Sequence, residues 1–151
     1  MPLEFVTGDP LLTRCQVLAF GHNAKGRTEL GHFETVLHDR HPAAFATYGK
    51  QCRNDRVKPG TLWLWRESQP TLGFMAVRET SVGATRLRYV EAILLELVRD
   101  YRLQNIQSVA FAPLGTSEEW PALRPVLSYW LKQAPFPCVV YERYTAGVSA
   151  E

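Results

Sequence analysis

The sequence has few cysteines, no long apolar run and little net charge, and each shortage excludes a class of protein. Its three cysteines, Cys15, Cys52 and Cys138, form no CxxC pair and no Cys/His cluster, so we expect reduced, mostly buried thiols and no zinc site. No uncharged apolar run approaches the roughly 18 residues that a membrane span needs. The first residues lack the basic head and apolar stretch of a signal peptide, so the default expectation is a cytoplasmic protein without membrane association.

The four histidines show no metal-ligand spacing, and no G-x-S-x-G or Cys/His nucleophile pattern is present. We therefore expect neither a metal nor another cofactor. The formal net charge is +2, from 17 basic and 15 acidic residues, which argues against a strongly electrostatic nucleic-acid binder but leaves room for a local basic patch.

What is present describes a globular chain of ordinary size. The 151 residues are 46% hydrophobic and 21% charged, which suits one domain with a real core and argues against disorder. There is no internal repeat, low-complexity tract or linker. We expect a single domain over residues 1–145, followed by a loose tail at 146–151.

Apolar periodicity predicts alternating strands and helices. The expected strands are 3–7, 16–20, 61–65, 72–77, 108–112 and 138–141. The expected helices are one with Leu30, Phe33, Val36 and Leu37 on its apolar face, one opened by Pro42, and two at 86–102 and 120–132. Pro125 should kink the last helix or delay its start. The alternation predicts an α/β fold with a mixed or parallel sheet covered on both faces.

Two polar, glycine-bearing loops follow expected strands, at 21–28 and 113–119. In such folds ligands bind beyond the carboxyl ends of the strands, so the two loops are expected to border a site. Asn23, Gly26 and Gly31 lie in or just after the first loop, where backbone N–H groups could approach an anion. That pattern is neither GxGxxG nor a Walker loop, so its specificity is low.

The second loop contains Gly115, Thr116 and Ser117, whose N–H and hydroxyl donors could hold phosphate oxygens. Thr116 and Glu119 also have capping-box spacing, and capping uses the same donors. Glu118 and Glu119 place two negative charges where a phosphate would lie. Near the N-terminus, Asp9 before Pro10 is either a turn or helix cap, or a carboxylate that accepts a hydrogen bond from a ligand amine.

In order and spacing, these segments resemble the macrodomain family, in the branch that contains the orphan-type and DNA-ADP-ribosyl-hydrolase antitoxin macrodomains. The segments that carry the resemblance are 6–11 (VTGDPL, against G-D-[IL]), 17–20 with Asn23, Gly26 and Gly31, 42–60, 112–115 (APLG, against P-x-[IL]-G) and 139–142. Together they span most of the chain, from about Phe5 to Tyr141.

The resemblance implies a three-layer α/β/α domain with a mixed sheet that binds ADP-ribose. It places Asp9, with Pro10 beside it, at the adenine amino group and Asn23 near the distal ribose. The loops 23–31 and 115–117 would wrap the diphosphate, and Tyr141 or Tyr144 would stack on adenine. Some members of the family remove ADP-ribose from protein side chains or DNA bases, so modified protein or DNA is a candidate partner.

The chain departs from this branch at its nucleophilic lysine, which falls at Arg78. An arginine stays protonated and does not readily form that covalent intermediate. If ADP-ribose is removed, we expect attack by activated water with Asn23 positioning the ligand, and Arg78 holding a phosphate or acidic group.

Two alternatives stay open: a non-catalytic interaction module with a collapsed groove, and a weak binder of RNA or single-stranded DNA. The arginines that would serve the latter are Arg27, Arg78, Arg86 and Arg88. The oligomeric state is not predicted.

Overall fold

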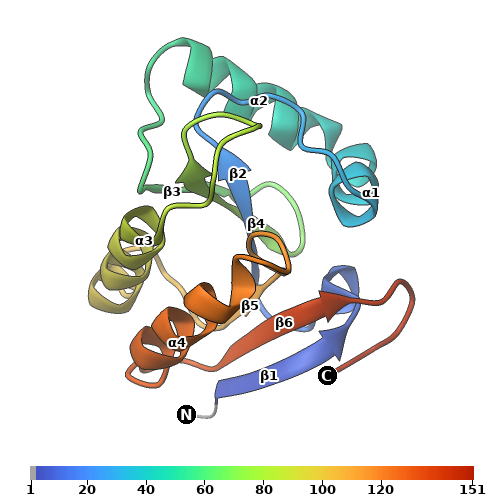
Figure 1. Ribbon diagram of the computed structural model, residues 1–151, viewed down its shortest axis with the longest axis vertical. Coiled ribbons are helices and arrows are strands. Elements are labelled where there is room, and N and C mark those ends of the chain that lie inside the picture. Colours follow the sequence, from blue (N-terminus) through green and yellow to red (C-terminus); the bar gives the residue numbers. More distant parts are fainter. Residues whose placement is uncertain (1–2) are drawn as a thin grey trace.

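The computed structural model describes residues 3–151, which form a six-stranded sheet between two pairs of helices (Figure 1). The strands are β1 (Leu3–Gly8), β2 (Val17–Asn23), β3 (Leu62–Trp65), β4 (Thr71–Arg78), β5 (Val109–Phe111) and β6 (Cys138–Tyr144). The helices are α1 (His32–Arg40), α2 (Pro42–Arg53), α3 (Leu87–Asp100) and α4 (Trp120–Leu131), and a short 3-10 turn, η1, spans Pro10–Leu12. The sheet order is β1-β6-β5-β2-β4-β3, and only β3 runs antiparallel to its neighbour. The predicted three-layer α/β/α fold with a mixed sheet is confirmed.

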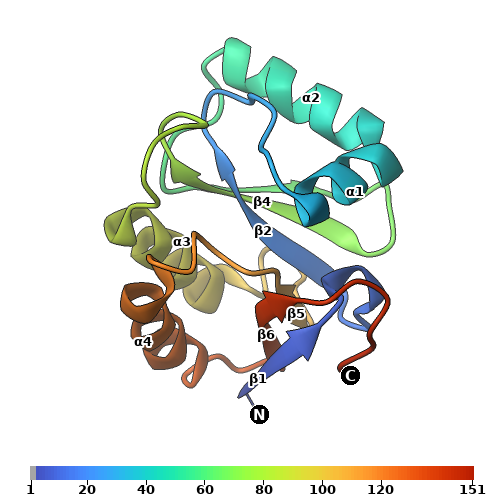
Figure 2. The same ribbon diagram turned by 45° about the vertical axis from the view of Figure 1, so that its right-hand side comes forward.

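Alternate residues of the central strands pack against opposite helix pairs. In β2, Val17 and Ala19 belong to the core under α3 and α4, whereas Leu18 and Phe20 belong to the core under α1 and α2. Figure 2 shows the two helix pairs on either side of the sheet. A strand buried on both faces has apolar residues on both, which is why this segment is a continuous apolar run.

The structure corrects one local expectation and narrows another. Leu30 was expected on the apolar face of the first helix, but α1 begins two residues later and Leu30 is 92% exposed. Gly31, the N-cap of α1, has a φ of +140°, which is outside the helical region, so the helix does not extend back to Leu30. Of the two effects expected of Pro125, a kink or a delayed start of the last helix, the delayed start does not occur, because α4 begins at Trp120 and continues through Pro125. All three cysteines are free, and only Cys138 is fully buried.

The parallel strands end at one edge of the sheet, and the chain after β6 returns to that edge beside β1. There the N–H of Thr145 donates to the Gly8 carbonyl at 2.9 Å, and the N–H of Asp9 donates to the Val148 carbonyl at 2.7 Å. Within residues 3–151, no helix has the length and apolar character required to cross a membrane.

Candidate functional site

A cavity of about 210 Å³, here called the groove, lies at the carboxyl edge of the sheet. Three loops border it. The loop after β2 contributes Glu29 and Leu30, the loop after β4 contributes Ser81, and the loop after β5 contributes Gly115 and Thr116. The loops predicted to meet at this edge therefore do meet, with space between them. A collapsed groove, which the interaction-module alternative predicts, is not what the structure has.

Arg78, the last residue of β4, lines the groove and is held from two sides. Its Nη2 lies 3.0 Å from Oε1 of Glu29, and its Nη1 donates to the Thr85 hydroxyl at 3.0 Å. The side chains of Arg78 and Glu29 are only 13% and 12% exposed. Because the pair is largely withdrawn from water, the loop after β2 is fixed to the end of β4.

Asn23 ends β2 and is fully buried. Its Nδ2 donates to the Arg27 carbonyl at 2.9 Å and to Oε2 of Glu29 at 2.6 Å. Its Oδ1 accepts hydrogen bonds from the N–H groups of Lys25 and Arg27 at 3.1 and 3.0 Å. The amide is thus committed to shaping the loop, and Asn23 does not line the groove.

The Thr116–Glu119 pair forms the reciprocal bonds expected of a capping box. The Thr116 N–H donates to Oε1 of Glu119 at 2.9 Å, and the Glu119 N–H donates to the Thr116 hydroxyl at 3.1 Å. Oε2 of Glu119 accepts the N–H of Thr85 at 2.9 Å. Burial raises the pKa of the Glu119 carboxyl, but the N–H donors of Thr116 and Thr85 outweigh it and lower the pKa overall. Glu118 is exposed.

Gly115 separates the groove from an adjoining cavity of about 420 Å³, and it lines both. Its φ is +70°, and a Cβ there would lie 2.7 Å from Cδ1 of Leu123, so the position requires glycine. Among residues 3–151, the N–H groups of Gly115 and Ser117 have no hydrogen-bond acceptor. These two donors are available to a ligand that spans the two cavities.

Of the residues expected to contact adenine, two are engaged by other parts of the protein and one lines a cavity. Both carboxylate oxygens of Asp9 accept backbone N–H groups, from Leu11 at 3.0 Å and from Gly147 at 2.9 Å. Tyr141 is fully buried and donates its hydroxyl to Glu151. Tyr144 instead lines the adjoining cavity, so it is the one of the two tyrosines that reaches a ligand space.

The structure therefore gathers some of the predicted residues and separates others. Arg78, Gly115 and Thr116 line the groove, and Ser117 lines the adjoining cavity. Those that line neither are Asp9, Pro10, Asn23, Gly26, Gly31 and Tyr141. A Cβ on Gly26 would lie 2.7 Å from the Cα of Gly49, so this glycine permits the loop to approach α2.

The groove residues that sequence reasoning missed include Glu29, Phe33 and Glu34. Phe33 was expected to face inward from its helical spacing, but no local pattern marks the two glutamates. The four arginines of the nucleic-acid alternative do not form one free basic patch, because Arg78 pairs with Glu29 and Arg86 pairs with Glu79 at 3.4 Å. Within residues 3–151, no group of three or more His, Cys, Asp or Glu side chains could hold a metal ion.

Comparison with known proteins finds the fold among solved structures. No protein-family model matches the chain, and no curated protein matches it. The macrodomain of Thermus aquaticus DarG aligns with a TM-score of 0.83 and 23% identity, over 93% of this chain and 98% of that one. The macrodomain of Mycobacterium tuberculosis DarG gives 0.82 and 24%, over 93% and 97%. Thermosipho africanus DarTG in complex with ADP-ribose gives 0.86 and 19%, over 100% of this chain and 43% of that one. The chain has the macrodomain fold.

Proposed function

We propose that this protein binds ADP-ribose or a closely related nucleotide in the groove and its adjoining cavity. The observation that carries the proposal is the pair of unused N–H donors of Gly115 and Ser117 on the loop between the two spaces. Backbone N–H groups next to the end of a parallel strand suit a diphosphate. The likeness to a DarTG structure that contains ADP-ribose supports the same ligand.

In this arrangement the diphosphate lies along the Gly115–Ser117 loop. The adenine lies toward Tyr144, whose ring can stack on it and contacts the Phe33 ring with the centroids 5.4 Å apart, and the distal ribose lies toward Arg78. Arg78 supplies the positive charge of the groove, although Glu29 offsets part of it. We expect moderate affinity, because the negative charge of Glu119 also lines the groove and repels a diphosphate. The Glu119 carboxylate also accepts the Thr116 N–H, so that donor is not free for the ligand.

We further propose that the protein removes ADP-ribose from modified protein or DNA. Lysine chemistry is not part of it, because Arg78 stands at that position and is paired with Glu29. Of the three carboxylates in the groove, Glu29 pairs with Arg78 and Glu119 accepts two backbone N–H groups. Within residues 3–151, Glu34 has neither an ion pair nor a hydrogen bond to another residue, and burial raises its pKa. Glu34 is the group we assign to activate water at the anomeric carbon. A cytoplasmic location belongs to the same proposal.

Isothermal titration calorimetry with ADP-ribose tests binding directly. We expect saturable binding by the wild-type protein, and at least about tenfold weaker binding by Ser81→Trp, whose indole would fill the groove. Glu91→Trp is the matched control, because Glu91 is exposed on α3 and lines no part of the groove. Absence of binding at millimolar ADP-ribose would end the proposal. Release of ADP-ribose from modified DNA or protein, lost in Glu34→Gln, tests the hydrolytic form.

A further inference from the structure

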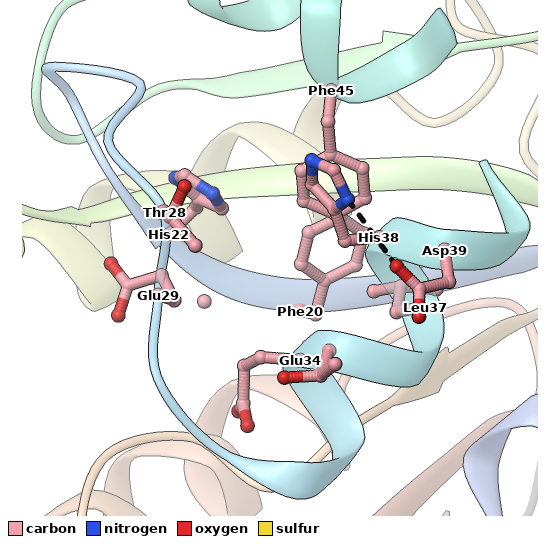
Figure 3. A pocket seen from close by; sticks show the side chains of 11 residues that line it. Phe20, His22, Thr28, Glu29, Glu34, Leu37, His38, Asp39 and Phe45 are labelled. Carbon is pink, nitrogen blue, oxygen red and sulfur yellow. Dashed lines mark ion pairs between the residues drawn. The ribbon is translucent and has the colours of Figure 1, made fainter. Parts of the chain in front are cut away.

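A second cavity of about 210 Å³, here called the ring pocket, lies beside the groove and is not used by the function proposed above. It is enclosed by β2, α1, α2 and the loop after β2, and Figure 3 shows the side chains that line it. Phe20, Gly21, Glu29 and Glu34 line both spaces. A ligand whose ribose occupies the groove at Glu34 can therefore extend its next group into the ring pocket.

His22 presents a hydrogen-bond donor to this pocket. The residue is only 3% exposed, and its Nδ1 lies 2.9 Å from the backbone nitrogen of Asn23 and 3.2 Å from the Asn23 carbonyl oxygen. That carbonyl accepts the Tyr48 hydroxyl at 2.9 Å, so the shorter contact, in which Nδ1 accepts the Asn23 N–H, sets the tautomer. A neutral imidazole with Nδ1 as acceptor carries its proton on Nε2. Burial lowers the pKa of His22, which favours this neutral form. Nε2 has no partner within residues 3–151, yet every fully buried side-chain nitrogen and oxygen there has one, so Nε2 must face the cavity.

The walls of the ring pocket are aromatic and its rim is acidic. The rings of Phe20 and Phe45 stack with their centroids 5.8 Å apart, and the His38 ring lies 5.0 Å from Phe45. Glu34 and Asp39 bring carboxylates to the rim, and neither pairs with a lysine or arginine within residues 3–151. Aromatic faces and unpaired carboxylates both favour a planar cation.

We propose that the ring pocket binds a planar, positively charged heteroaromatic ring that carries a carbonyl group and is joined to the distal ribose. This inference rests on the proposed function of the groove. The carbonyl accepts the Nε2–H of His22, and the ring lies against the aromatic wall formed by Phe20, Phe45 and His38, with its charge near Glu34. A guanidinium does not meet these requirements, because it has no acceptor for the histidine donor. The nicotinamide ring of NAD⁺ has all of these features, so NAD⁺ is the ligand that the pocket selects over ADP-ribose.

Calorimetry with three ligands tests the inference on the full chain. ADP-ribose lacks the ring, NAD⁺ has the cationic ring, and NADH has the same carboxamide on an uncharged ring. We expect NAD⁺ to bind about tenfold more tightly than ADP-ribose and several-fold more tightly than NADH. Equal affinity for NAD⁺ and ADP-ribose, or for NAD⁺ and NADH, would overturn the inference. Absence of ADP-ribose binding would instead overturn the proposed function, so the two failures are distinct.

A pair of loop variants locates the ring. Thr28 is exposed and lines the ring pocket but not the groove, so Thr28→Phe should reduce NAD⁺ affinity to that of ADP-ribose while ADP-ribose binding is retained. Lys25→Phe, in the same loop but outside both spaces, should bind NAD⁺ as the wild type does. Tight NAD⁺ binding by a folded Thr28→Phe protein would place the ring elsewhere and refute the assignment.

Discussion

The guanidinium of Arg78 and the carboxylate of Glu29 lie 3.0 Å apart at the floor of the groove, and both side chains are largely buried. The other oxygen of that carboxylate accepts a hydrogen bond from Asn23 at 2.6 Å. The ends of β2 and β4 are thereby tied to the loop that borders both the groove and the ring pocket. The position of this loop therefore depends on a buried charge pair as well as on Gly26.

Replacing Arg78 by methionine should leave the Glu29 carboxylate buried without a cation. We expect the free energy of unfolding, measured by urea denaturation, to fall by about 3 kcal/mol. Adding Glu29→Gln in the same chain should recover part of that loss, because it removes the unpaired charge. Arg86→Met breaks the exposed pair with Glu79 and serves as the control, with an expected loss below about 1 kcal/mol. Equal losses from the two single variants would contradict a structural role for the buried pair.

Replacing Asn23 by aspartate should destabilise the loop in a pH-dependent way. The change removes the Nδ2 donor and places a second carboxylate beside Glu29. Two adjacent carboxylates raise the pKa of one of them in the folded state, so the folded protein holds a proton that the unfolded chain has lost. The deficit in unfolding free energy should therefore grow as pH rises from about 4 to about 7, reaching about 2 kcal/mol or more. Asn23→Ala should show a similar loss of hydrogen bonds without this pH dependence.

His22 should make the protein less stable under mildly acidic conditions. Burial lowers its pKa below the ordinary value for histidine; the hydrogen bond to the Asn23 backbone and the charge of Glu29 oppose this effect, and Arg78 and His38 add to it. As pH falls below 6.5 the unfolded chain takes up a proton before the folded protein does, so the unfolding free energy decreases. In His22→Asn, the new Oδ1 can still accept the Asn23 N–H. Urea titrations at several pH values should show a flatter profile below pH 6.5 for this variant than for the wild type; identical profiles would assign the pH dependence elsewhere.

The segment after β6 provides a test of the loose tail expected at 146–151. Its backbone contacts predict slow hydrogen exchange for the N–H of Gly147, which donates to Asp9, and for the N–H of Asp9, which donates to Val148. Asp9→Asn should accelerate exchange at Gly147, because an amide offers one acceptor oxygen where the carboxylate offers two. Exchange at Leu94, buried in α3, is the internal control. Rapid exchange at Gly147 in the wild-type protein would favour the loose tail.

Much of the architecture could be predicted because its signals are local. Strand and helix periodicities need only a few neighbouring residues, and they placed the run 17–20 in the sheet and Phe33 and Leu37 on the inner face of α1. The Thr116–Glu119 capping box is also a spacing within one turn, and its reciprocal bonds are present. Leu30 was misplaced because Gly31 takes a positive φ and separates it from the helix, a backbone conformation that apolar spacing does not reveal.

The sequence by itself determined the alternation of strands and helices, the two loops at the carboxyl edge and the arginine at the end of β4, since each depends on residue types and short spacings. Only the tertiary structure decided that Arg78 forms an ion pair with Glu29 and that the Gly147 N–H donates a hydrogen bond to Asp9. It also decided that the Nε2 of His22 faces a cavity. These contacts connect residues that are far apart in the chain and become neighbours only because of the order of the strands in the sheet. A side chain's partners across that distance depend on packing, which no local pattern encodes.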